Sequence, residues 1–110
     1  MSYDVTIKRG DTRHALKAIL KNAQGSPVDL TGCTVTFRMA SLWQSVLVDR
    51  EVDIHDAIAG EVWVVWSPGE TDVSGVYRAE FQVVYGDGRR ETFPNNGYIN
   101  IKILTDLRGD

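Results

Sequence analysis

Apolar and polar side chains alternate along most of this chain, and that two-residue period constrains its fold more than any other feature. In the stretch "TVTFRM", Val35, Phe37 and Met39 alternate with threonine and arginine. The same spacing runs from Tyr77 to Tyr85. Successive side chains of a β-strand point to opposite faces, so this period predicts strands with one buried face and one solvated face.

The period recurs in short segments that are separated by clusters of glycine, proline, asparagine and aspartate. We expect strands at 3–8, 13–22, 33–40, 60–66, 77–85, 89–93 and 98–104, with a short hairpin made of 46–49 and 51–54. Residues 15–21 also resemble a short helix, but two brief apolar cycles without a strong cap favour a strand. Gly86-Asp87-Gly88 predicts a tight hairpin turn, because glycine adopts the positive φ angles that such turns need.

About seven to nine short strands without a convincing helix predict an all-β fold, an immunoglobulin-like antiparallel β-sandwich. We expect one domain over residues 1–110. Asp72, Gly75 and Tyr77 are spaced almost as in the tyrosine corner of that fold, so we expect them to hold a structural corner. Ala79 then stands where an antibody domain carries its second cysteine, and Phe37 takes the core place of its tryptophan.

Charge and cysteine content narrow the function classes. The 12 basic and 15 acidic residues give a net charge of −3, which argues against nucleic acid as a partner. Cys33 has no second cysteine to pair with, so we expect folding in a reducing compartment. No apolar run approaches the roughly 20 residues of a membrane span, and the N-terminus alternates rather than forming a signal core.

The sequence contains little that predicts catalysis. His14 and His55 are the two candidate bases, and neither lies in a recognisable motif. Asp53 and His55 share a strand face, but two ligands do not make a metal site. We therefore expect no enzyme activity, no cofactor, no metal and no small-molecule ligand. A small hydrolase stays as an alternative, which requires a cleft that holds His55, Asp53 and a nucleophile.

Tryptophan on the outer side of a strand is the strongest indication of a contact surface. In "EVWVVW", Trp63 and Val65 lie opposite the core-facing residues, and the 41–48 connection carries Leu42 and Trp43. Loop and strand either cover each other, or they form a protein–protein interface, where aromatic residues are common anchors. The predicted interface residues are Leu42, Trp43, Trp63 and Val65.

Several motifs together resemble the immunoglobulin-like N-terminal domain of phage baseplate upper proteins. They occur in order over nearly the whole chain: "RGDT" at 9–12, "GSPVDLTG" at 25–32, "VTFRM" at 35–39, "GVYRAEF" at 75–81, "YGDG" at 85–88, "ETFP" at 91–94 and "GYINI" at 97–101. Each motif combines a turn with a strand, so the order of the motifs carries more weight than any one of them.

The resemblance implies a structural or adaptor protein of a bacteriophage virion, in the tail, baseplate or neck. It implies contacts with other phage structural proteins and with copies of itself, and assembly in the host bacterial cytoplasm. It brings no catalytic residues. Family members often continue into a further region, so an end at Asp110 favours a stand-alone adaptor. The alternative is a carbohydrate-binding or host-surface adhesin module with Trp43 as a sugar platform.

Overall fold

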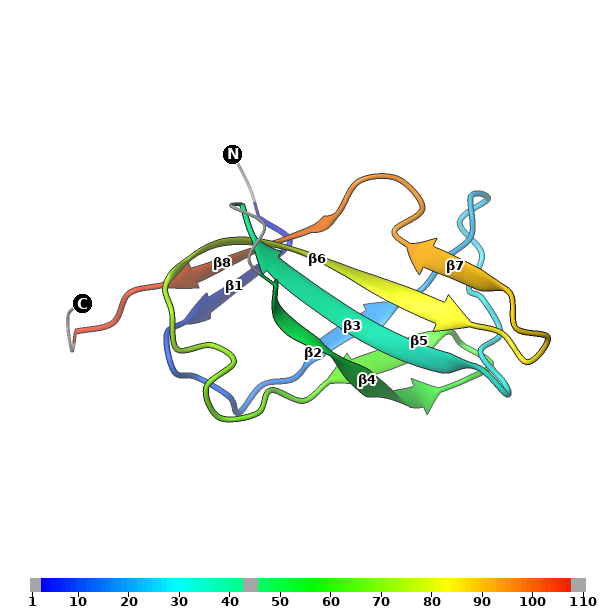
Figure 1. Ribbon diagram of the computed structural model, residues 1–110, viewed down its shortest axis with the longest axis horizontal. Helices are drawn as coiled ribbons and strands as arrows, with labels where there is room; N and C mark the ends of the chain where they lie inside the picture. Colours follow the sequence, from blue (N-terminus) through cyan, green and yellow to red (C-terminus); the bar gives the residue numbers. More distant parts are fainter. Residues whose placement is uncertain (1–2, 43–45, 108–110) are drawn as a thin grey trace.

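The computed structural model describes residues 3–42 and 46–107, and every regular element in these ranges is a strand. The strands are β1 (Val5–Lys8), β2 (Leu16–Ile19), β3 (Thr34–Ser41), β4 (Val46–Asp56), β5 (Glu61–Val64), β6 (Gly75–Val84), β7 (Arg90–Phe93) and β8 (Ile99–Leu104). The long strands β3 and β6 cross the front of the molecule, and β2 lies behind them (Figure 1). The all-β prediction is confirmed.

The strands follow the order β1-β8-β6-β3-β4-β5-β2, with β7 paired to the second half of β6. This path curls into a sandwich that is almost a barrel, and its two end strands, β1 and β2, do not pair with each other. The expectation of purely antiparallel pairing fails at one place, because β1 runs parallel to β8. The two strands are distant in sequence, so no hairpin forces the antiparallel direction.

The hairpin predicted at 46–54 is wrong, because these residues form the single long strand β4. The side chains of Val48, Arg50 and Val52 share one face of this strand, and the charge of Arg50 interrupts the apolar pattern without breaking the backbone. The first part of β4 pairs with β3, and its last residues pair with β5. β4 thereby joins the two sides of the sandwich.

The core lies between the two sides and contains the residues that the alternation predicts to face inward. Phe37 and Phe81 are fully buried, with ring centroids 5.2 Å apart, and Trp66 packs edge-on against Phe37 at 5.8 Å. Ala79 is also buried. Phe37 therefore does occupy a central core position, and Trp66 lies beside it. The indole nitrogen of Trp66 is buried without an acceptor among the described residues.

The turn between β4 and β5 packs closely against Leu20, which follows β2, and against Val28. Gly60 has φ 68°, and a Cβ atom there would lie 2.8 Å from the Val28 carbonyl oxygen and 2.9 Å from that of Leu20. The Leu20 N–H donates a hydrogen bond of 2.9 Å to the Gly60 carbonyl. Glycine is needed here because both the backbone conformation and the close approach exclude a side chain.

The other predicted elements agree with the structure in position and differ in length. The predicted strand at 13–22 shortens to Leu16–Ile19, since residues 13 and 14 form a bend and Lys21 forms only an isolated bridge with Pro27. At the predicted turn of 86–88, the Gly88 N–H donates to the Tyr85 carbonyl and the Tyr85 N–H to the Arg89 carbonyl. These bonds join β6 to β7 and confirm the tight hairpin. The turn that follows β7 contains a cis Phe93–Pro94 peptide.

Candidate functional site

Trp63 lies on the outer face of β5, where its neighbours in the same sheet cover it. The His55 ring stacks on the indole with centroids 3.8 Å apart and planes at 11°. The Lys17 ammonium lies 4.3 Å from the ring centroid, and the indole N–H donates a 2.6 Å hydrogen bond to Glu61. These contacts come from β2, β4 and β5, so Trp63 is covered within its own sheet, without the described part of the 41–48 connection. We call this surface, with the exposed Val65 beside it, the Trp63 face.

Leu42 lies on a different surface, beside a hollow of about 330 Å³ on the outer side of β3 and β6. We call it the Tyr98 hollow. Its lining residues are Arg38, Met39, Ala40, Ser41, Leu42, Val46, Arg78, Glu80 and Tyr98. Leu42, Val46 and Tyr98 have exposed fractions of 46%, 63% and 50%, so the rim of the hollow is open to solvent. The Arg78 guanidinium lies 5.4 Å from the Tyr98 ring centroid.

The structure does not bring the predicted interface residues together on one surface. Val46, at the hollow, pairs with Ala40, whereas Asp53, seven residues further along β4, pairs with Trp63. An extended strand of that length spans roughly 23 Å. Leu42 therefore belongs to one surface, and Trp63 belongs to another with Val65. Trp43 lies outside the described residues.

The predicted corner has the geometry of a tyrosine corner. The Tyr77 hydroxyl donates a 2.6 Å hydrogen bond to the carbonyl of Val73, four residues upstream, and burial raises the pKa of the phenol. The Asp72 N–H donates to the Gly69 carbonyl at 3.4 Å. Gly75 begins β6 with φ 150°, a conformation that favours glycine. These hydrogen bonds join the start of β6 to the connection that precedes it.

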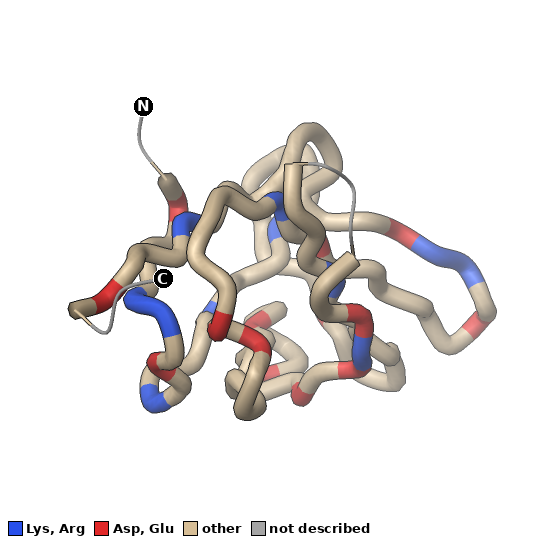
Figure 2. The backbone as a smooth tube through the Cα atoms, turned by 60° about the vertical axis from the view of Figure 1, so that its left-hand side comes forward, with Lys and Arg blue, Asp and Glu red and all other residues tan. Residues whose placement is uncertain are grey.

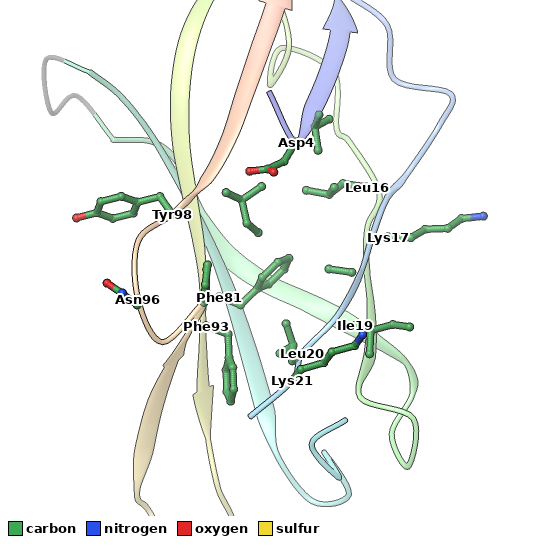
Figure 3. A pocket seen from close by; sticks show the side chains of 14 residues that line it. Asp4, Leu16, Lys17, Ile19, Leu20, Lys21, Phe81, Phe93, Asn96 and Tyr98 are labelled. Carbon is green, nitrogen blue, oxygen red and sulfur yellow. The ribbon is translucent and has the colours of Figure 1, made fainter. Parts of the chain in front are cut away.

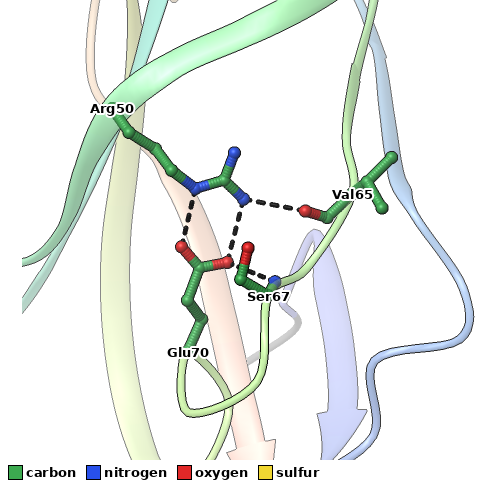
Figure 4. A network of polar contacts seen from close by, with 4 residues as sticks. All are labelled: Arg50, Val65, Ser67 and Glu70. Carbon is green, nitrogen blue, oxygen red and sulfur yellow. Dashed lines mark hydrogen bonds and ion pairs between the residues drawn. The ribbon is translucent and has the colours of Figure 1, made fainter.

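An ion pair that the sequence did not predict holds the connection between β5 and β6. Arg50 donates to both carboxylate oxygens of Glu70, at 2.7 and 2.9 Å, and also to the Val65 carbonyl at 2.8 Å. The Ser67 N–H donates to the same carboxylate at 2.7 Å (Figure 4). Hydrogen bonds from Arg50, outweighing the opposing effect of burial, hold the pKa of Glu70 below its ordinary value. The indication of this ion pair in the sequence is a charged residue, Arg50, at a position that shares a strand face with Val48 and Val52.

A groove of about 530 Å³ runs along the seam between β2 and the segment that joins β7 to β8. Figure 3 shows the rings of Phe81 and Phe93 between the chain that carries Leu16 to Lys21 and the chain that carries Asn96 and Tyr98. We call it the seam groove. Its lining is mostly apolar, and the lining residues are Asp4, Val5, Leu16, Lys17, Ala18, Ile19, Leu20, Lys21, Phe81, Phe93, Pro94, Asn96, Tyr98 and Ile99.

Neither His55 nor Asp53 lines the seam groove or the Tyr98 hollow. Asp53 and His55 lie on the outer side of β4, where the His55 ring is stacked on Trp63. Burial raises the pKa of the Cys33 thiol, which disfavours the reactive thiolate. Burial and a 2.6 Å hydrogen bond to Glu91 raise the pKa of Tyr85 to about 12. Residues 3–42 and 46–107 contain no group of three or more acidic, histidine or cysteine side chains that could hold a metal ion.

The described segments also contain no apolar helix of membrane-spanning length. Basic and acidic residues are interspersed along the backbone in the view of Figure 2. The described residues present three surface features: the Tyr98 hollow, the Trp63 face and the seam groove.

Comparison with known proteins places this arrangement in a family. None of the curated proteins matches the chain. A similar solved structure is the N-terminal domain of phage TP901-1 ORF48, with a TM-score of 0.58 and 17% sequence identity, covering 93% of this chain and 83% of that one. This likeness supports the fold. The family model for the BppU N-terminal domain matches residues 1–103. The chain therefore belongs to the family of baseplate upper protein (BppU) N-terminal domains, which are structural parts of the phage baseplate.

Proposed function

We propose that this chain is a non-enzymatic adaptor of the phage particle that acts through protein–protein contacts. The observation that carries the proposal is the family match, which extends over residues 1–103 and so over nearly the whole chain. Its partners are other phage structural proteins and copies of itself, and it assembles in the host bacterial cytoplasm. It binds neither nucleic acid nor membranes.

The Tyr98 hollow is the first surface that we assign to these contacts. Exposed Leu42, Val46 and Tyr98 surround it, and Arg78 lies against the Tyr98 ring. Tyrosine and arginine are frequent anchors in protein interfaces, because each combines a large contact area with a polar group. Its rim is exposed, which suits a side chain of a partner protein better than an enclosed ligand.

The Trp63 face is the second surface. Val65 is 57% exposed there, and Ile19 of β2 is 52% exposed. Trp63 contributes less free area, because His55 and Lys17 lie against its ring. We therefore expect Leu42 to contribute more to binding than Trp63.

Particle incorporation tests the proposal. A tagged copy of the chain, expressed during phage infection, should co-purify with particles. Leu42→Asp combined with Tyr98→Ala should lower incorporation about tenfold or more, because both residues lie at the proposed contact. The matched control is Ile58→Asp, which places the same charge at an exposed position of the β4–β5 turn. Absence of the unmodified chain from purified particles would overturn the proposal.

The glycan-binding alternative depends on Trp43 and stays a prediction, since that residue lies outside the described ranges. A glycan array compares the two functions directly. Binding of the unmodified chain that is lost with Trp43→Ala would favour the adhesin over the adaptor.

A further inference from the structure

The outer edge of β2 has no strand partner among the described residues. β2 is the last strand in the sheet order, and its four residues pair with β5 on one side. The Leu20 N–H donates to Gly60, on the β5 side. Backbone groups of an antiparallel edge strand alternate between inward and outward directions. The N–H and C=O groups of Ala18 therefore face β5, and those of Lys17, Ile19 and Lys21 face the opposite side.

The opposite side is the seam groove. Its floor is apolar, with Phe81 and Phe93 between β2 and the segment that carries Asn96 and Tyr98 (Figure 3). Ile19 and Tyr98 are about half exposed at its rim. An extended segment placed here would hydrogen-bond to the edge of β2 and would turn every second side chain towards the groove.

Charge indicates the chemistry of such a segment. Lys17 and Lys21 are the two basic residues of the lining, and neither forms an ion pair with a described residue. Asp4 is the acidic residue of the lining, and its carboxylate accepts a 2.8 Å hydrogen bond from the Asn100 N–H. The Lys17 ammonium lies against the Trp63 ring and keeps its charge, so the two lysines give the lining more positive than negative charge, which favours an acidic partner.

The same charges disfavour a second copy that pairs edge to edge through β2. Two β2 strands placed side by side would bring the lysines of both copies together, and lysines on an edge strand are a known protection against such pairing. The partner must instead bring negative charge.

We propose that the outer edge of β2 and the seam groove bind an extended segment of another protein in which apolar and acidic residues alternate, added to the sheet as a further strand. The identification of that protein as a phage structural component depends on the proposed function. The strand-addition site itself depends on the unpaired edge, the groove and the lysines.

A peptide titration tests the site on the full chain. The probe is a short synthetic peptide that alternates valine and glutamate, followed by NMR of the backbone amides. Binding should shift the amide signals of Lys17, Ile19 and Lys21 and slow their hydrogen exchange. The same peptide with N-methyl groups on every second residue, on the edge that faces β2, should bind about tenfold more weakly or worse, because its backbone donors are lost. A valine–lysine peptide should bind more weakly still. The chain carries a net charge of −3, so general attraction does not favour the acidic probe.

Two variants locate the binding. Ile19→Pro removes an outward N–H without removing a bond to β5, and Ile19→Val is its matched control, which keeps the donor. The proline variant should lose at least about tenfold in peptide affinity, and the valine variant should keep it. Lys17→Glu combined with Lys21→Glu tests the charge and should weaken binding of the acidic probe about tenfold. If the proline variant does not fold, this double variant still tests whether the peptide binds at β2.

Particle incorporation separates this inference from the proposed function. If the unmodified chain enters particles and the folded Ile19→Pro variant does not, the adaptor role and the strand-addition site are both supported. If both chains enter equally and the peptide does not bind at β2, the strand-addition site is wrong and the adaptor role stands. If neither enters, the proposed function fails, and the peptide titration alone decides on the site. Peptide binding at the Tyr98 hollow, or equal binding of the N-methylated probe, would overturn the inference.

Discussion

β5 and β2 are neighbours in the same sheet, but they differ in the number of their edges that pair with another strand. β5 pairs on both sides, with β2 and with β4. At its start lies the close-packed Gly60, and the connection at its end is fixed by Arg50 and Glu70. β2 has a partner on one side and the seam groove on the other.

This difference indicates that β5 and its contacts stabilise the sandwich, whereas the outer edge of β2 is available for binding. Contacts between residues of the same chain stabilise the fold, so substitutions that remove them should lower the free energy of unfolding. An unpaired edge contributes little to stability and remains available for a partner. Substitutions around β5 should therefore change stability, and substitutions on the outer edge of β2 should change binding.

The largest effect is expected for Gly60→Ala. We expect a loss of about 3 kcal/mol, because the new methyl group meets two backbone carbonyls and the φ angle is unfavourable for alanine. Gly25→Ala is the matched control: it has φ 82° with nothing near the new methyl group, so it should lose about 1 kcal/mol. Urea unfolding measures both. Equal losses would show that the turn does not pack closely against Leu20 and Val28.

Trp63→Ala should cost about 2 kcal/mol, because it removes the stacking with His55 and the contact with Lys17. Particle incorporation should change less than with the Leu42 and Tyr98 substitutions. Thermal unfolding and incorporation are measured on the same preparation. A variant of unchanged stability that no longer enters particles would make Trp63 a contact residue.

Glu70→Gln should cost about 1–2 kcal/mol at neutral pH, since it weakens the charged hydrogen bonds to Arg50. The pKa of Glu70 is lower in the folded chain than its ordinary value of 4.5. Its contribution is therefore fully present above that ordinary value and is lost as the pH falls through the folded pKa. The stability difference between the two chains should shrink in acid, as followed by urea unfolding across pH. A difference that stays constant to low pH would contradict the ion pair.

Tyr77→Phe should cost about 1 kcal/mol, because it removes the hydrogen bond to Val73 and leaves the buried ring in place. Urea unfolding at neutral pH measures the loss. Tyr98→Phe, at an exposed tyrosine, is the control and should be neutral. A neutral Tyr77→Phe would mean that the corner is held without its hydroxyl.

The smallest stability effect is expected for Ile19→Pro, at about 0.5 kcal/mol, since proline is tolerated on a free edge. Ala18→Pro is the contrasting variant, because the Ala18 N–H faces β5 and its loss should cost about 3 kcal/mol or more. Thermal unfolding compares the two. Equal losses of stability in the two variants would show that both edges of β2 form hydrogen bonds within the chain.

The sequence predicted those features that depend on neighbouring residues. Alternation placed the strands and the core-facing Phe37, and local spacing identified Tyr77 and the 86–88 turn. The sequence did not predict features that depend on residues far apart in the chain. Arg50 interrupts the alternation of β4, and its carboxylate partner comes from Glu70, beyond the next strand.

The cover of Trp63 was missed for a similar reason. The pairing of β4 with β5 shifts register around His55, two residues beyond Asp53, which lies opposite Trp63. Alternation within one strand contains no information about such a shift. The seam groove likewise depends on which strands are neighbours, and a period of two does not specify strand order.

The most direct test of the adaptor role is an electron cryomicroscopy map of purified phage particles that carry this chain. We expect density for the sandwich at a fixed position, with protein from a neighbouring subunit against the Tyr98 hollow. Particles that assemble fully and contain no density for the chain would contradict the account.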